Sequence, residues 1–338
     1  MKISVIILNW NGSAMLKKML PSVVHYSQEE STEVCVADNC STDDSVSMLR
    51  RDFPTVRLIL LDKNYGFAGG YNLAIKQVEA EYIVLLNSDV EVAESWLQPL
   101  LHYMDTHLEI AACQPKIRSF VFKDKFEYAG AAGGFIDRYG YPFCRGRIMG
   151  DVENDSGQYD TIVPVLWASG AALFIRREDY LNAGGLDARF FAHMEEIDLC
   201  WRLRNRGRGV VCIPQSMVFH IGAATLKKEN PQKTFLNFRN NLIMLYKNLP
   251  AKKLKRVMRV RVVLDYIAAL SFLFTGNFKG FKAVLQARKA YCKLRPSFLP
   301  SRQENIKKTV VHHIPECKNY SILWKYYAKH QKTFDQIL

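Results

Sequence analysis

Two groups of acidic residues have a spacing that suits chemistry. Asp89 and Glu91 stand two residues apart after a strongly apolar run, and Glu195, Glu196 and Asp198 fall within four positions. Oxygens of the first pair could bind Mg²⁺ or Mn²⁺, and the cation would neutralise a departing diphosphate. The carboxylates of the second group repel one another unless one of them is protonated or paired with a cation. Such unfavourable electrostatics is often found at functional sites.

Each group also has a structural explanation. Asp89 or Glu91 could cap a following helix. A helix is predicted over 195–206, and acidic residues in its first turn, with Arg202 and Arg204 further along, would suit the helix dipole. The position of Asp89 at a strand end beside a glycine-rich loop favours metal or diphosphate binding for the first group.

The glycine-rich loop is the stretch from Asn64 to Asn72. Its glycines, Gly66, Gly69 and Gly70, precede a predicted helix, so backbone N–H groups and a helix N terminus could meet a diphosphate. Such glycines can also serve tight turns alone. The spacing is neither that of a Walker loop nor that of a dinucleotide-binding fingerprint.

Asp38 occupies a similar position at the end of another apolar run. A carboxylate there could accept hydrogen bonds from a base or a ribose. The turn that follows contains Asn39, Thr42 and Asp43, and Thr42 or Asp43 could cap the next helix. Nucleotide binding and turn formation are therefore both open for Asp38.

The elements that would position these residues are short apolar runs separated by stretches with helical spacing. The runs recur roughly every 23–31 residues and are rich in Ile, Val or Leu. They predict successive βα units in a mainly parallel sheet, which binds ligands outside the carboxyl ends of its strands. The predicted strands lie at 3–8, 33–38, 56–61, 81–87 and 110–114.

Later segments differ in character. Glycines punctuate aromatic and charged residues over 116–165, which is typical of loops and hairpins and suits an insertion on the acceptor side. Apolar runs at 171–175, 209–212 and 217–220 predict further strands. A helix is predicted over 231–248.

The C-terminal part is strongly basic. Residues 249–338 contain 19 Lys and Arg against four Asp and Glu, so the net charge of +13 resides there. Their longest apolar stretch, 262–274, falls short of the ~20 residues of a membrane-spanning helix. We predict a catalytic domain over 1–248 and a basic amphipathic helical extension over 249–338, either interfacial or packed on the domain.

The composition narrows the class of protein. A hydrophobic share of 49% excludes a disordered chain. The eight cysteines are scattered without a CxxC pair, which predicts reduced thiols in a cytosolic protein. The apolar run at 3–8 is too short for a signal peptide, so export is not expected.

Six segments taken together resemble the family-2 glycosyltransferases with the GT-A fold, a Rossmann-like α/β fold whose mainly parallel sheet is flanked by helices. The similarity is to the rhamnosyltransferase-like branch that builds bacterial surface polysaccharides, and it covers roughly residues 1–248. The segments are Asn64–Asn72, Asn87–Glu91, Trp167–Ala171, Gly184–Phe191, Glu195–Arg204 and His220–Gly222.

The resemblance implies an inverting transfer without a covalent enzyme intermediate. It implies that Glu196 is the general base, with Glu195 and Asp198 beside it in the catalytic group. Asp38 would hold the base or ribose of the donor. The other implied nucleotide-sugar contacts are Asn9, Asn39, Asn64, Gly66, Phe67, Gly70, Asn72 and Asn87.

The resemblance also implies a divalent cation and a sugar pocket. Mg²⁺ or Mn²⁺ would be held by Asp89 and Glu91, where the family commonly has Asp-x-Asp, and His220 would complete the metal site. The acceptor or donor sugar would be lined by Trp167, Ser169 and Gly170.

The function expected from these features is transfer of a sugar from a nucleoside-diphosphate sugar to a saccharide acceptor. The donor would be deoxythymidine-diphosphate rhamnose or a uridine-diphosphate hexose, and the acceptor would be lipid-linked, in cell-surface polysaccharide synthesis. A nucleotidyltransferase and a non-catalytic carbohydrate-binding protein are the alternatives. The segment 9–12 lacks the basic phosphate loop that a nucleotidyltransferase would favour.

The basic extension predicts the location of the protein in the cell. Its cluster at 252–256, followed by an apolar helix, suits anionic lipid head groups. The same pattern could bind the phosphates of nucleic acid, but a lipid-linked acceptor favours the membrane, and no nucleic-acid partner is expected. We therefore expect a cytoplasmic protein, peripheral on the inner face of the cell membrane.

Overall fold

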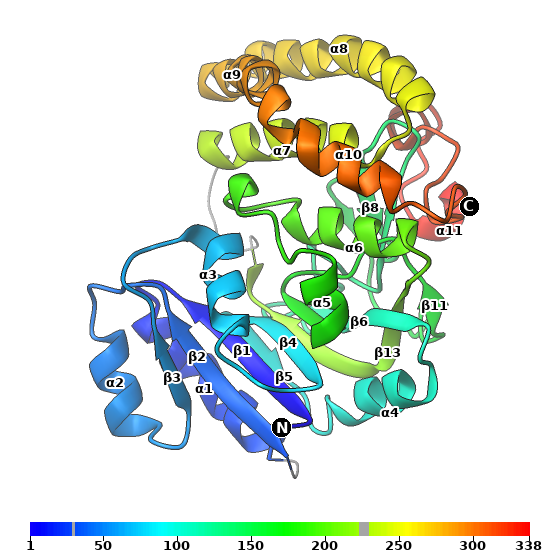
Figure 1. Ribbon diagram of the computed structural model, residues 1–338. Helices are drawn as coiled ribbons and strands as arrows, with labels where there is room; N and C mark the ends of the chain where they lie inside the picture. The colour runs from blue at the N-terminus through cyan, green and yellow to red at the C-terminus, as the bar shows by residue number, and fades with distance from the viewer. Residues whose placement is uncertain (29–30, 223–229) are drawn as a thin grey trace.

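A computed structural model describes residues 1–28, 31–222 and 230–338. In these residues the core is a nine-stranded sheet (Figure 1). Eight strands follow one another in the order β3 (Arg57–Leu60), β2 (Thr32–Asp38), β1 (Ile3–Asn9), β4 (Tyr82–Asn87), β12 (Ala172–Arg176), β6 (Ile110–Ser119), β13 (Gly209–His220) and β11 (Val163–Pro164). The ninth strand, β5 (Val90–Val92), pairs with β13.

The sheet is mainly parallel, as the sequence predicted. β1 pairs in parallel with β2 and β4, and β6 pairs in parallel with β13. Strand β12 is antiparallel and lies between β4 and β6. Helices cover both faces, so the central strands are apolar along their whole length instead of alternating with polar residues.

The two faces of the sheet bury separate sets of side chains. In β1, Val5 and Ile7 pack on one face and Ile6 on the other, as the pleat of a strand requires. The first face is covered by α1 (Ser13–Tyr26), α2 (Ser45–Asp52) and α4 (Gln98–Thr106). The second face carries α3 (Gly66–Ile75), α5 (Arg177–Asn182) and α6 (Glu195–Asn205).

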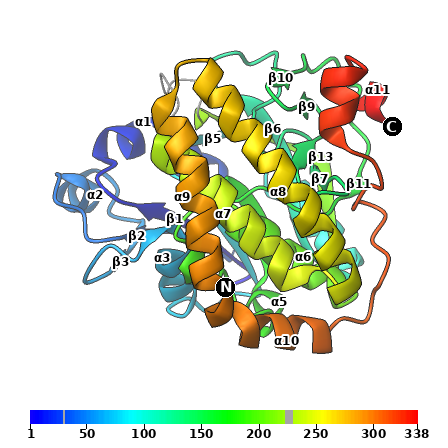
Figure 2. The same cartoon turned by 90° about the horizontal axis from the view of Figure 1, so that it is seen from above.

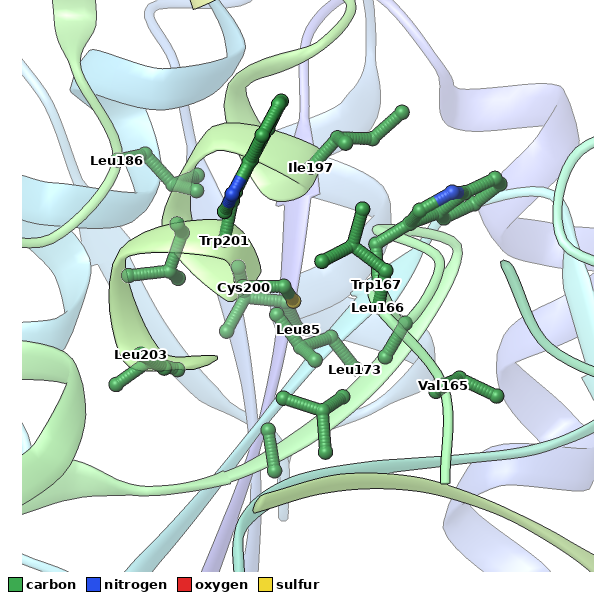
Figure 3. Packing of buried hydrophobic residues seen from close by; sticks show 14 of the residues in the cluster. Leu85, Val165, Leu166, Trp167, Leu173, Leu186, Ile197, Cys200, Trp201 and Leu203 are labelled. Carbon is green, nitrogen blue, oxygen red and sulfur yellow. The ribbon is translucent and has the colours of Figure 1, made fainter. Parts of the chain in front are cut away.

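Helix α6 is fixed on the sheet by its apolar side. Figure 3 shows Ile197 and Cys200 of α6 gathered with Leu85 of β4 and Leu173 of β12. Each such buried side chain contributes about 1.5–3 kcal/mol relative to an exposed one. This packing holds the first turn of α6, with its three carboxylates, at a defined place over the sheet.

The segment 116–165 forms a small antiparallel sheet beside the main one. Its strands are β7 (Gly134–Ile136), β8 (Pro142–Cys144), β9 (Arg147–Ile148) and β10 (Asp151–Val152). Gly134 is needed because a Cβ there would lie 2.1 Å from the indole of Trp167. The hairpins predicted for this segment are therefore present.

Two elements differ from the prediction. Helix α3 begins at Gly66, so Gly69 and Gly70 lie inside the helix and not before it. Gly70 lets α3 approach β1, since a Cβ there would lie 2.7 Å from Leu8. The two strands predicted near 209–220 are one strand, β13, which shifts its register against β6 between Ile213 and Met217.

The C-terminal part is helical and packs on the rest of the protein. After α7 (Pro231–Asn248), Figure 2 shows α8 (Ala251–Phe274) and α9 (Phe278–Leu294) side by side across the molecule, both in contact with α7. A 3₁₀ turn (Arg295–Phe298), α10 (Leu299–Lys307), a π-helical turn (Trp324–Ala328) and α11 (Phe334–Ile337) follow. Within the described ranges, none of the helices combines the length and apolar character that crossing a bilayer demands.

A buried charge network joins α8 to its neighbours. The Arg261 side chain is 1% exposed and donates to Asp265, to the backbone oxygen of Tyr139 in the 116–165 segment and to the side chain of Asn241 in α7. Arg288 of α9 also donates to Asp265. The basic extension is therefore attached by specific polar contacts as well as by apolar packing.

Arg261→Ala should lower the free energy of unfolding by about 3–5 kcal/mol, because it leaves the buried Asp265 carboxylate with one fewer cation. Urea unfolding followed by circular dichroism measures the change. Arg259→Ala on the exposed side of the same helix is the matched control and should change stability by less than about 0.5 kcal/mol. Equal effects of the two substitutions would show that the network does not hold the extension.

Candidate active site

The carboxyl ends of β1 and β2 bring two predicted residues into contact. The parallel register sets Asn9 opposite Asp38, and the Asn9 amide donates to Asp38 Oδ2 at 3.0 Å. The second oxygen, Oδ1, accepts from the Ser41 backbone N–H at 2.8 Å. Both side chains are buried. Asp38 thus takes part in the turn after β2 while lying at the sheet edge where nucleotides bind in α/β folds.

Asn39 and Asn64 shape the glycine-rich loop. Asn39 donates to Asn64 Oδ1 at 3.0 Å and to the Gly66 carbonyl at 3.1 Å, and its own oxygen accepts from the Tyr65 N–H at 2.9 Å. Gly66 adopts a φ of 70°, and a Cβ there would lie 2.8 Å from the Phe191 ring. The backbone N–H groups of Gly66 and Phe67 already bind Asn64 and Phe191. The loop is therefore rigid, and these two N–H groups have internal partners.

Asn72 also makes internal contacts. Its amide donates to the Leu186 carbonyl at 2.7 Å, and its oxygen accepts from the Tyr180 hydroxyl at 2.6 Å. It thereby ties α3 to the turn at 184–186. The structure places Asn72 where it positions elements of the site.

The pairing of β5 with β13 brings Asp89 to His220. Imidazole Nε2 of His220 lies 3.0 Å from Asp89 Oδ1, and the Gly222 N–H donates to Asp89 Oδ2 at 3.3 Å. Asn87 Nδ2 lies 3.4 Å from the same imidazole nitrogen. Asn87 and Asp89 of one predicted segment thus meet His220, which lies more than 130 positions away in the sequence.

Asp89 and His220 stabilise each other's charged forms. Burial by itself would raise the pKa of Asp89, but the hydrogen bond and charge of His220, together with backbone hydrogen bonds, outweigh it and lower the pKa below its usual value. For His220, burial would lower the pKa, yet the bonds to Asp89 and Glu127 raise it to about 10. The imidazole is therefore a cation beside a carboxylate at neutral pH.

Glu127 is a residue of this site that no sequence pattern predicts. Its Oε2 lies 3.5 Å from His220 Nδ1, and the side chain is 4% exposed. Glu127 comes from the 116–165 segment, far from β13 in the sequence. The one general indication of such a residue is that a buried histidine commonly has a hydrogen-bonding or charged partner at each ring nitrogen.

Glu91 lies apart from this group. Its carboxylate pairs with Lys123 at 2.8 Å. Neighbouring side chains of a strand point to opposite sides, and Val90 and Val92 take the buried side of β5. Among residues 1–28, 31–222 and 230–338, no three His, Cys, Asp or Glu side chains are arranged to hold a metal by themselves.

The three carboxylates at the start of α6 have different surroundings. Asp198 is fully buried and accepts from Arg202 at 2.9 Å, Lys247 at 2.6 Å and Asn248 at 2.8 Å. For both Glu195 and Glu196, the buried Oε2 atom has no hydrogen-bond partner in the part of the chain that the structure describes.

Burial gives the two glutamates higher pKa values than an exposed pair of glutamates would have. Burial and the adjacent charge of Glu196 raise the pKa of Glu195 well above its usual value. Burial raises the pKa of Glu196 to about 7. The Glu196 side chain is half-buried, and its raised pKa makes this carboxylate suited to exchange a proton near neutral pH.

Gly170, in the segment predicted to line the sugar pocket, lies next to Glu196. A Cβ on Gly170 would lie 3.7 Å from Glu196 and 3.5 Å from the Phe67 ring, so these three residues meet. Trp167 and Ser169 are buried behind them: the indole donates to the Phe135 carbonyl, and the Ser169 hydroxyl donates to the Ala129 carbonyl. Trp167 and Ser169 therefore support the wall that Gly170 forms.

A strained loop precedes α6, and the sequence does not predict it. Phe191, His193 and Met194 adopt φ values of 69°, 70° and 74°, each costing about 1–3 kcal/mol. Asn240 of α7 compensates by donating to the carbonyls of Phe190, Ala192 and His193 at 2.8–3.0 Å. Burial lowers the pKa of His193 to about 4, so its ring is neutral.

The chain is similar in sequence to known proteins. The chain is 27% identical over 232 residues to the O-antigen biosynthesis protein RfbC of Myxococcus xanthus, covering 68% of this chain and 18% of that protein. It is 25% identical over 230 residues to the N-acetylglucosaminyl-diphospho-decaprenol L-rhamnosyltransferase of Mycobacterium tuberculosis, covering 64% and 75%. The chain thus spans less than a fifth of the length of the first relative.

The fold has counterparts among solved structures. The mannosyltransferase PcManGT of Pyrobaculum calidifontis, in complex with GDP-Man and Mn²⁺, superimposes with a TM-score of 0.51 over 91% of this chain and 84% of that chain, at 13% identity. At this identity the likeness concerns the fold.

The fold and the named relatives agree with the predicted glycosyltransferase of the GT-A fold. Residues 4–157 match the sequence model of glycosyl transferase family 2. This match agrees with the predicted resemblance to the family-2 glycosyltransferases, and the glycosyltransferase prediction is confirmed.

Proposed function

We propose that the protein transfers a hexose or deoxyhexose, such as rhamnose, from a nucleoside-diphosphate sugar to a hydroxyl of a lipid-linked saccharide during cell-surface polysaccharide synthesis. Glu196 is the observation that carries the proposal. Its side chain is half-buried, its pKa is raised to about 7, and its Cβ and Cγ lie close to Gly170 at the carboxyl edge of the sheet. Relatives named for O-antigen synthesis and for rhamnosyl transfer to a diphospho-decaprenol saccharide support the substrate class.

In this proposal Glu196 accepts the proton of the acceptor hydroxyl as that oxygen attacks the anomeric carbon. Attack from the face opposite the leaving diphosphate inverts the configuration, so no covalent enzyme intermediate is needed. Desolvation helps, because a carboxylate whose pKa lies close to the working pH is an efficient base. Asp198 has a positioning role, since its oxygens bind Arg202, Lys247 and Asn248.

Glu196→Gln should lower the turnover of acceptor glycosylation by about 100-fold or more while leaving donor affinity unchanged, because the amide keeps the shape and cannot accept a proton. The base acts when deprotonated, so wild-type turnover should rise as pH increases through about 7. Glu196→Gln should lose this rise.

Glu195→Gln is the matched control for this experiment. It removes the adjacent buried carboxylate and should retain the pH-dependent rise. If Glu195→Gln abolishes turnover and Glu196→Gln does not, the role of base belongs to Glu195. Product formation over pH 5.5–8.5 distinguishes the two results.

A divalent cation fits the edge of the sheet near Asp89. The Asp89 carboxylate is partly exposed, and the His220 imidazole beside it would become a ligand on releasing the proton that it holds toward Asp89. A carboxylate and a neutral imidazole are a ligand pair of the kind that Mn²⁺ accepts. Such ions commonly take one or two protein ligands and complete their shell with substrate phosphates and water. We propose Asp89 as the main ligand, with His220 beside it; the bound cation would supply charge stabilisation for the departing diphosphate.

Asp89→Ala should abolish Mn²⁺ binding in the presence of a nucleoside diphosphate and should lower turnover by about 100-fold or more. Glu91→Ala should change both by less than about threefold, because Glu91 pairs with Lys123. Electron paramagnetic resonance of bound Mn²⁺ measures the first effect independently of activity. Full activity after exhaustive chelation would contradict the metal assignment.

We further propose that α8 places the protein on the inner surface of an anionic membrane. Its outer face exposes Val263, Ile267, Leu270 and Phe274, the last of them 86% exposed. Exposed basic residues, Lys252, Lys255 and Arg259, lie on the same helix. Apolar and cationic side chains on one helix suit an interfacial position.

Ile267→Glu with Phe274→Glu should reduce flotation of the full chain with vesicles that contain anionic lipid at least fivefold, because charge replaces the side chains expected to enter the interface. Leu108→Glu, at another exposed leucine, is the control and should float like the wild type. Wild-type flotation should weaken as salt rises. Equal flotation of all three proteins would exclude this face as the contact.

A further inference from the structure

A cavity lies outside the candidate active site. It has a volume of about 400 Å³ and is bounded by the C-terminal half of α6, the junction of α7 and α8, and the segment 306–319. None of its described lining residues belongs to the candidate active site. Its size falls within the ~300–1,000 Å³ range of small-molecule sites.

The floor of the cavity is apolar. Trp201, Leu245, Leu249, Val257 and Ile314 line it and are themselves buried. They come from α6, α7, α8 and the returning segment, so the floor is a surface shared by several elements. Such a floor suits a hydrocarbon chain or another apolar group.

The rest of the lining is cationic. Arg138, Lys253, Arg256 and Lys318 all line the cavity, and none of the four forms a salt bridge with another described residue. The one carboxylate in the lining, Asp137, is buried and accepts from the backbone N–H groups of three other residues, so its charge is already compensated. An excess of positive charge therefore faces the cavity.

Two further donors border the same space. Asn205 is 6% exposed and lines the cavity, and its Nδ2 has no hydrogen-bond partner among the described residues. Leu249 and Pro250 also line the cavity, where α8 begins without a side-chain cap from any described residue, so free N–H groups of its first turn and the positive end of the helix dipole lie at the border of the cavity. Both features favour an anion.

We propose that this cavity binds a phosphate or diphosphate ester that carries an apolar chain. Lys253 and Arg256 hold the phosphate oxygens, and the chain lies on the floor between Trp201 and Val257. The binding chemistry follows from the cavity alone, whereas its identification with the carrier lipid of the acceptor rests on the proposed function. A soluble phosphate ester and a membrane lipid share this chemistry.

The arrangement of α8 supports a source in the membrane. Lys253 and Arg256 occupy its first two turns, and the exposed apolar face defined by Val263, Ile267, Leu270 and Phe274 follows on the same helix. A phosphorylated lipid in contact with that face needs to travel only along one helix to reach the cavity.

Calorimetric titration of the full chain with geranyl diphosphate, inorganic pyrophosphate and geraniol tests the proposal. Geranyl diphosphate should bind at least about tenfold more tightly than either of the other probes, since only it satisfies both the cations and the floor. The double variant K253A/R256A should weaken its binding at least about tenfold. The matched double variant K252A/K255A, on the same helix but outside the cavity, should stay within about twofold.

Further variants distinguish the loss of ligand binding at the cavity from unfolding of the protein. Val257→Trp fills the cavity and keeps every charge, so it should weaken geranyl diphosphate much more than pyrophosphate, with circular dichroism confirming the fold. Equal binding of pyrophosphate and geranyl diphosphate, or unchanged binding by K253A/R256A, would overturn the proposal. Vesicles containing a long-chain polyprenyl phosphate should compete with geranyl diphosphate if the source is a membrane lipid; absence of competition limits the site to soluble esters and overturns its assignment to the carrier lipid.

The active site is tested separately. Asp89→Ala and Glu196→Gln should bind geranyl diphosphate as the wild type does, and loss of binding in either variant would place the probe in the active site and contradict a second cavity. Sugar transfer is assayed independently with the same proteins. Binding without any transfer activity would therefore overturn the proposed function and leave the cavity proposal standing.

Discussion

The position of the catalytic helix depends on one buried carboxylate. Asp198 binds Arg202, Lys247 and Asn248, while Arg202 also donates to the Gly185 carbonyl and Lys247 to Asp187. Removing the cations would leave a charge in an apolar interior, which costs several kcal/mol. The network therefore forces α6, α7 and the turn at 184–187 into a single relative arrangement, and the place of Glu196 over the sheet follows from it.

The three carboxylates at the start of α6 differ in their chemistry because their surroundings differ. Asp198 has three side-chain donors for its two oxygens. Glu195 and Glu196 each have an oxygen without a hydrogen-bond partner among the described residues, and burial raises their pKa values. Proximity in sequence would suggest a shared role, but the partners that other elements supply decide which carboxylate can exchange a proton with a substrate.

Local patterns were sufficient to predict the strands and the residues at their ends. Buried strands leave continuous apolar runs, and parallel pairing makes Asn9 meet Asp38 without further information. Glu127 and Asn240 could not be predicted, because each acts on residues about 50 or more positions away in the sequence. The direction of Glu91 depends on the short strand β5, which is too brief to show a pattern. The attachment of the extension was equally hidden, since Arg261 looks like one more basic residue until Asp265 and Asn241 are seen around it.

The return of the chain to the 116–165 segment has a consequence for the order of events during synthesis. Lys318 donates its N–H to the Ile136 carbonyl, Ile322 donates to Asp137, and the Tyr326 hydroxyl donates to Asp151. Almost two hundred residues separate these partners, and the later ones leave the ribosome last. At a translation rate of ~5–20 residues per second, the 116–165 segment waits on the order of ten seconds or more for them. The wall that supports Gly170 and His220 is therefore finished late, so a nascent chain acquires its sheet well before it acquires a complete site.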